Sequence, residues 1–229
     1  MTAHLKEIRE RLIRVIIVVG VTFAISFGLS EEIFRIIQAP IKNYELIFLS
    51  PTEAIFVHLK LSFFFALVLC IPYILYHIWE FVSPGLLPKE RRHILPFVLF
   101  STFFFALGVL FAYFLIIPFG IAVLMTYKTR ALQPRISVGK YISFVFLLLF
   151  NFGVIFEMPP IVFFLSKIGL IKPSMLVKKR KYAIVIIFIM SAILTPPDVV
   201  TQLLMALPLI MLYEISIFVC RRVYRNKKT

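Results

Sequence analysis

Long apolar runs separated by short charged segments make up most of this 229-residue chain. Six runs can be delimited, at residues 13–29, 54–79, 94–119, 138–166, 182–194 and 201–219. They are continuous rather than alternating, which favours helices over barrel strands, the only other structure that satisfies its backbone hydrogen bonds in lipid. Because a spanning helix needs about 20 residues, the pattern predicts one all-α integral membrane domain, residues 1–229, with six transmembrane helices.

The fifth run, 182–194, is the shortest. At a rise of about 1.5 Å per residue it reaches only about 20 Å, against a hydrocarbon core of roughly 30 Å. The segment 194–198, Leu-Thr-Pro-Pro-Asp, separates it from the last run and predicts a tight turn between antiparallel helices. We therefore expect a locally thinned bilayer at this hairpin.

The composition excludes a soluble fold, since 61% of the residues are hydrophobic and the mean hydropathy is +0.99. The net charge of +14 resides in short clusters between the apolar runs, as in loops at an anionic membrane surface, so nucleic-acid binding is not expected. With six spans, 18 of the 25 Lys and Arg residues fall on the side that holds both termini. That side is expected to be cytoplasmic, although the outer loop 127–140 is also basic.

Glu157 interrupts the fourth apolar run. A charge near mid-membrane costs roughly 2.5–3.5 kcal/mol, so this carboxyl is expected to face protein or water. It is interpreted either as a structural carboxyl bonded to a neighbouring helix or as the lining of a polar cavity. Pro159 and Pro160 remove two backbone donors and predict a kink beside it. The longest outer loop, 30–53, is expected to fold as a short cap.

The inner segment 81–92 combines aromatic, turn-forming and charged residues at the membrane surface. Its Glu90 either pairs with neighbouring arginines, for under about 1 kcal/mol per pair, or joins Glu7 in a carboxylate pair. Such a pair could hold a guanidinium through bidentate hydrogen bonds and would select arginine over lysine.

Polar residues at the start of the last run allow two interpretations. Asp198 and Gln202 either cap the last helix or contact a helix of another protein, for about 0.6–2 kcal/mol each. Glu214 could serve either role. The four histidines lack metal-ligand spacing and no HExxH, GxSxG or P-loop motif occurs, so no metal, cofactor or enzyme activity is expected.

Four segments, in this order along the chain, resemble the TatC family, the multispanning subunit of the twin-arginine (Sec-independent) protein translocase. They are 4–12 at the entry to the first run, 81–92, 152–157 (Phe-Gly-Val-Ile-Phe-Glu) and 194–202 (Leu-Thr-Pro-Pro-Asp-Val-Val-Thr-Gln). The resemblance covers nearly the whole chain. It implies a glove-like six-helix fold with a concave face. It also implies a receptor for folded cargo with twin-arginine signal peptides, driven by the proton-motive force. An N-terminus unlike a transit peptide favours a bacterial cytoplasmic (inner) membrane over a thylakoid or mitochondrial one.

The resemblance also implies roles for individual residues. The cytoplasmic recognition surface would comprise Glu7, Arg9, Arg11, Phe81, Pro84, Glu90 and Arg91. Glu157 would be the acid of the cavity and Pro40 the outer-loop proline. Single-span TatA/TatB-type subunits would dock near Thr195, Asp198 and Gln202. The other expected partners are the signal peptides, membrane lipid and further copies of the chain within a larger complex.

Two other functions remain open from the residues. A secondary transporter could use Glu157 to bind a proton or cation, and would take up a small solute by itself. A structural assembly factor for membrane proteins would be indifferent to paired arginines in its clients. The four segments favour the receptor.

Overall fold

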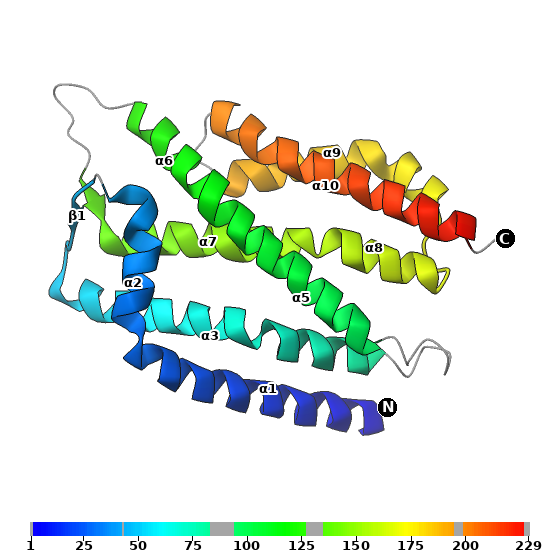
Figure 1. Ribbon diagram of the computed structural model, residues 1–229, viewed down its shortest axis with the longest axis horizontal. Coiled ribbons are helices and arrows are strands. Elements are labelled where there is room, and N and C mark those ends of the chain that lie inside the picture. The colour runs from blue at the N-terminus through cyan, green and yellow to red at the C-terminus, as the bar shows by residue number, and fades with distance from the viewer. Residues whose placement is uncertain (1, 43, 83–93, 127–134, 195–198, 227–229) are drawn as a thin grey trace. The chain divides into compact units, whose positions relative to one another are not determined.

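The computed structural model describes residues 2–42, 44–82, 94–126, 135–194 and 199–226, and these are helical almost throughout (Figure 1). The longer helices are α1 (Thr2–Gly28), α3 (Pro51–Val82), α5 (Ile94–Phe111), α7 (Val138–Phe156), α9 (Pro173–Leu194) and α10 (Val199–Asn226). The shorter elements are α2 (Ser30–Gln38), η1 (Ala39–Ile41), β1 (Leu46–Ile47), η3 (Ala112–Ile116), α6 (Ile117–Thr126), β2 (Ile136–Ser137) and α8 (Met158–Lys167).

Five helical stretches of the described chain are long and apolar enough to cross a membrane, namely Lys6–Gly28, Pro51–Phe81, Leu95–Thr126, Val138–Lys167 and Gln202–Arg225. The prediction of a polytopic all-α membrane protein is confirmed. Helix α9 has 22 residues, or about 33 Å, but its first half carries the basic run 178–181. The helix is therefore longer than the apolar run 182–194 that predicted it, because hydropathy does not register a charged helical turn.

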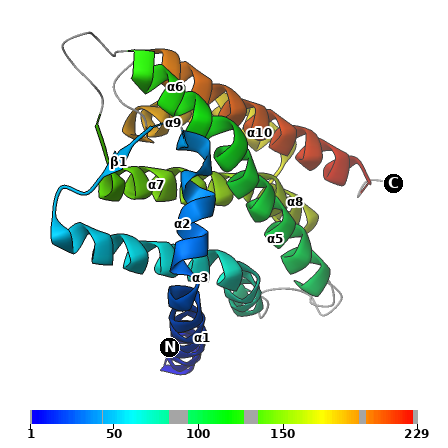
Figure 2. The ribbon, with the colours of Figure 1, turned by 60° about the vertical axis from the view of Figure 1, so that its left-hand side comes forward.

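The chain divides into two compact units. The first comprises Met1–Thr102 and Lys128–Phe146, and the second comprises Phe103–Tyr127 and Leu147–Thr229. In the first unit, α1 and α3 lie antiparallel and side by side, and α2 packs against α3 (Figures 1 and 2). Two polar contacts join α2 to its neighbours: His58 Nδ1 lies 3.0 Å from Ser30 Oγ, and the Tyr141 hydroxyl donates to the Ile37 carbonyl at 2.7 Å. The predicted outer loop thus contains a helix anchored by side chains.

The first turn of α3 is tied to a distant part of the same unit. Glu53 Oε1 accepts hydrogen bonds from Ser137 Oγ at 2.5 Å and from the Gly139 amide at 2.7 Å, and its Oε2 accepts from the Leu49 amide at 2.6 Å. Alongside, β1 and β2 pair in parallel, with Leu46 opposite Ile136. This carboxylate and strand pair fasten the start of α3 to the start of α7.

In the second unit, α8 and α9 both pack against α10. The Tyr213 hydroxyl donates to the Leu176 carbonyl at 2.8 Å, and Ser166 Oγ donates to Cys220 Sγ at 2.9 Å. Helices α5 and α7 also approach closely here, since a Cβ at Gly108 would lie 2.5 Å from the Phe152 carbonyl oxygen. Glycine is required at that crossing because any side chain would push the two backbones apart.

Prolines account for two irregular turns. Helix α7 ends at Phe156 and α8 begins at Met158, with Pro159 and Pro160 buried at its start. The predicted kink is confirmed, because neither proline has an N–H to continue the α7 hydrogen bonding. The π-helical turn η3 ends at Ile116, two residues before Pro118 in the first turn of α6, and a widened turn at this place accommodates the proline, which has no N–H to donate.

Candidate functional site

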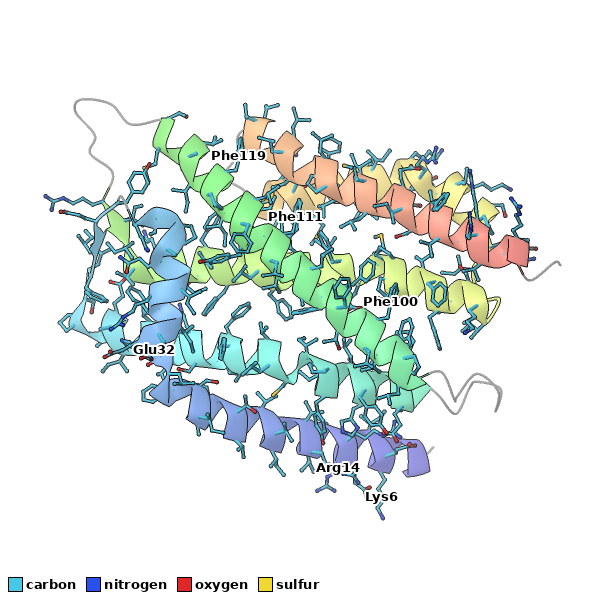
Figure 3. The ribbon with its side chains drawn as sticks, viewed as in Figure 1. Lys6, Arg14, Glu32, Phe100, Phe111 and Phe119 are labelled. Carbon is cyan, nitrogen blue, oxygen red and sulfur yellow. The ribbon has the colours of Figure 1, made fainter. Side chains whose placement is uncertain are left out.

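The N-terminal end of α1 and the C-terminal end of α3 together carry a charged cluster. Glu7 and Arg11 lie one turn apart on α1, and Arg11 Nη2 donates to Glu7 Oε1 at 2.5 Å. The side chain of Arg11 is 17% exposed and that of Glu7 36%. Figure 3 shows Lys6 and Arg14 projecting from α1 on the side away from α3. Unlike Lys6 and Arg14, Arg11 therefore lies against α3.

The facing side of α3 presents His77, Glu80 and Phe81. Arg11 Nη2 lies 3.9 Å from Glu80 Oε2, and His77 Nδ1 lies 3.5 Å from the same oxygen. The Arg11 guanidinium carbon is 6.0 Å from the centre of the Phe81 ring, within the range of a cation–π attraction. The guanidinium is thus held among two carboxylates and one aromatic face.

The two ion pairs of Arg11 contribute little to the stability of the fold. An i,i+4 pair of this exposure contributes about 0.3–0.5 kcal/mol, whereas leaving a mostly buried cation without any counter-ion costs more. Within the described residues, Arg11 Nη1 is buried and has no hydrogen-bond partner. The cluster can therefore exchange partners cheaply, provided that one carboxylate stays beside Arg11.

An apolar groove begins at this cluster and runs between α1 and α3. Its first part, of about 370 Å³, includes Arg11 and Phe81 among its lining residues together with Ile8, Leu12, Ile74 and Ile78. Its second part, of about 400 Å³, shares Val15 and Ile74 and continues past Val19, Gly20, Phe23 and Phe63. A ligand with a charged end and an apolar continuation would match this sequence of surfaces.

The structure brings three of the seven predicted recognition residues together: Glu7, Arg11 and Phe81. Arg9 is exposed on α1. The other three lie outside the described residues, and so the pairing of Glu7 with the second predicted carboxylate stays a prediction; these residues are Pro84, Glu90 and Arg91.

Sequence reasoning missed Glu80 and His77. Glu80 directly follows the apolar run 54–79 and directly precedes the segment 81–92, where the recognition residues were predicted. A helical projection would have found both residues, because 73, 77, 80 and 81 share one helix face. It would not have found Arg11 opposite them.

The remaining predicted residues lie elsewhere. Glu157 is 6% exposed at the break between α7 and α8, and Pro40 is half-buried in η1. Gln202 Nε2 donates to the Phe188 carbonyl at 3.1 Å and so joins α10 to α9. Thr195 and Asp198 lie outside the described residues.

Glu214, which was open to either of two roles, forms an ion pair with Arg180 of α9 at 2.8 Å. Both side chains are part-exposed, so the pair contributes little to stability. Its position nevertheless ties the middle of α10 to the basic first half of α9.

Fold and site together define a multi-pass helical membrane protein with a charged cluster at the end of a helix pair. The sequence matches the TatC family, described as Sec-independent protein translocase protein, over residues 3–208. It is 42% identical to the Sec-independent protein translocase protein TatC of Desulforapulum autotrophicum, over 99% of this chain and 86% of that protein. It is 44% identical to that of Aquifex aeolicus, over 100% and 97%.

Solved structures agree. A crystal structure of the twin arginine translocase receptor TatC in DDM has a TM-score of 0.85 and 44% identity, covering 94% of this chain and 98% of that one. A second crystal structure of such a receptor has a TM-score of 0.85 and 43% identity, covering 96% and 99%. The chain belongs to the TatC family of Sec-independent protein translocase subunits, which confirms the resemblance noted in its sequence.

Proposed function

We propose that this chain is the signal-peptide receptor of a twin-arginine translocase in a bacterial inner membrane. It binds the paired arginines of folded cargo proteins where α1 and α3 end together. The observation that carries this proposal is the cluster of Glu7, Arg11 and Phe81, on a chain that resembles structures named twin arginine translocase receptor. Transport would draw on the proton-motive force, and the chain would not act as an enzyme.

The chemistry of recognition rests on guanidinium geometry. Glu7 supplies a carboxylate that can take an arginine in a bidentate pair, and Glu90 is the second carboxylate of the proposed site. Phe81 offers an aromatic face on which a planar guanidinium stacks better than an ammonium does. Arg9, Pro84 and Arg91 would complete the surface.

Further parts of the proposal concern the membrane assembly. Both termini and the recognition surface would face the cytoplasm, in line with the excess of basic residues on that side. Single-span TatA/TatB-type subunits would dock near Thr195, Asp198 and Gln202, and several copies of the chain would assemble with them. Glu157 would line an intramembrane cavity, and Pro40 would shape the outer cap.

The test is binding of a twin-arginine signal peptide to the detergent-purified protein and to the assembled complex. A peptide with Lys-Lys in place of Arg-Arg is the comparison, because the charge is the same. We expect at least about tenfold tighter binding of Arg-Arg, or about 1.4 kcal/mol. Glu90→Ala should abolish the preference and Glu7→Ala should reduce it.

The matched control is Glu32→Ala, an exposed acid on α2 that also removes one negative charge. It should leave binding unchanged. Equal binding of the two peptides in the assembled complex, or unimpaired export of a twin-arginine reporter by Glu90→Ala, would overturn the proposal. Uptake of a small solute by the protein alone in liposomes would favour a transporter instead.

A further inference from the structure

We propose that Glu80 is a specificity-determining residue of the recognition site, where it receives Arg11 when an incoming arginine takes Glu7. This inference rests on the proposed function and deepens it. In the unliganded chain Arg11 already occupies Glu7, at 2.5 Å. The protein's own guanidinium thus holds the place that a signal arginine would take, and it must leave for the signal to bind.

The geometry allows that exchange with little movement. Glu80 Oε2 is 3.9 Å from the same Nη2 atom that contacts Glu7, so a small rotation of the guanidinium would close the gap. The Glu80 side chain is 30% exposed, which leaves it free to adjust. His77, which is 8% exposed, lies 3.5 Å from the same carboxylate oxygen and limits the directions in which that oxygen can move.

The displaced Arg11 needs this second acceptor. Its side chain is mostly buried against α3, and a buried cation that loses its only counter-ion is strongly penalised. Without Glu80, the free-energy cost of leaving Arg11 unpaired would weaken the binding of every signal peptide. With Glu80, one ion pair is exchanged for another of the same kind.

Arg11 also sharpens the choice between arginine and lysine. An incoming side chain must bind Glu7 better than Arg11 does. A signal arginine can form two parallel hydrogen bonds to the carboxylate, whereas the ammonium of lysine is a strongly hydrated point charge without that fork. Arg11 is therefore a competitor for Glu7 that a lysine of the signal peptide displaces poorly.

The experiment is a double-mutant cycle on peptide binding. Affinities for the Arg-Arg and Lys-Lys peptides are measured for the wild type, Glu80→Gln, Arg11→Gln and the double variant, all in the assembled complex. We expect Glu80→Gln to weaken Arg-Arg binding about tenfold, equivalent to about 1.4 kcal/mol. In the Arg11→Gln background the same change should have less than about a twofold effect, because no displaced cation remains to be received.

Two further variants serve as controls. Glu10→Gln removes one charge from the exposed side of the same end of α1 and should not change affinity. Glu80→Asp keeps the charge but shortens its reach, and should weaken binding less than Glu80→Gln; it also provides the measurement if Glu80→Gln does not fold.

Several outcomes would overturn the inference. An equal loss in both Arg11 backgrounds would mean that Glu80 contacts the peptide directly, and no loss in either would mean that it plays no part. A wild-type complex that binds the two peptides equally would instead overturn the proposed function itself. If the wild type prefers Arg-Arg but the effects of Glu80→Gln and Arg11→Gln on affinity simply add, only the role of Glu80 is overturned and the proposed function stands.

Discussion

Helix α3 carries a glutamate near each end, and the two are used in opposite ways. At its start, Glu53 accepts three hydrogen bonds of 2.5–2.7 Å from Ser137, Gly139 and Leu49. At its end, Glu80 has two ionisable neighbours, His77 at 3.5 Å and Arg11 at 3.9 Å. One carboxylate is saturated by close donors, and the other lies among groups that it does not yet bind tightly.

The difference lies in the kind of partner. The donors around Glu53 are the Ser137 hydroxyl on β2 and two backbone amides, one in the first turn of α7 and one in the short segment between β1 and α3. The partners of Glu80 are side chains that can rotate and that carry or can acquire charge. Fixed neutral donors hold a carboxylate in one arrangement, whereas long cationic side chains permit an exchange. The first end of α3 therefore stabilises the fold, and the second end carries the cluster that we propose for recognition.

The largest expected effect follows from removing the saturated carboxylate. Glu53→Ala should lower the unfolding temperature by several degrees, because the amides of Gly139 and Leu49 lose their acceptor. Glu80→Ala should cost less than about 1 kcal/mol of stability. Fluorescence of the single tryptophan, Trp79, can follow unfolding of both variants. Equal losses would contradict the comparison.

A smaller effect is expected from crowding the same clamp. A Cβ on Gly139 would lie 2.7 Å from Glu53 Oε1, so Gly139→Ala should displace the carboxylate and lower the unfolding temperature less than Glu53→Ala. Gly28→Ala is the control, because nothing lies within 4 Å of a Cβ there. The comparison would fail if both glycine variants unfolded at the wild-type temperature.

At the other end of α3, Phe81→Leu should act on binding rather than on stability. It removes the aromatic face that the proposed site offers to a signal arginine, a face that lies 6.0 Å from the Arg11 guanidinium carbon in the unliganded chain, while keeping an apolar side chain. Loss of a cation–π contact of about 0.5–1 kcal/mol corresponds to roughly two- to fivefold weaker binding of the Arg-Arg peptide. Phe81→Tyr should bind as the wild type does. An unfolding temperature lowered as far as in Glu53→Ala would assign Phe81 to the fold instead.

The smallest expected effect is that of ionic strength, which should act on the Glu80 end of α3 and not on the Glu53 end. Raising salt from about 0.1 M to about 0.5 M shortens the screening length from about 10 Å to about 4 Å and should weaken Arg-Arg binding about twofold. The same change should leave the unfolding temperature of the wild type almost unaltered, because the donors around Glu53 are neutral. A salt-dependent loss of stability that disappears in Glu53→Ala would refute this reading.

Local features of the chain were predictable because they depend only on neighbouring residues. The continuous apolar runs predicted the spanning helices, and Pro159 with Pro160 predicted the break at Glu157. Ser50 three residues before Glu53 is a pattern typical of a helix start, yet it reveals only the local half of the clamp. Helix α9 began earlier than its apolar run, since hydropathy overlooks charged helical turns.

The sequence by itself determined that this protein is a multi-pass helical membrane protein of the TatC family, because apolar run length and short motifs are properties of contiguous residues. Only the tertiary structure decided which side chains meet. It joined Glu53 to Ser137, 84 positions away, and it set Arg11 between Glu7 and Glu80. Such meetings depend on which helices lie side by side and on how each is rotated about its axis, and in lipid an apolar pattern encodes neither.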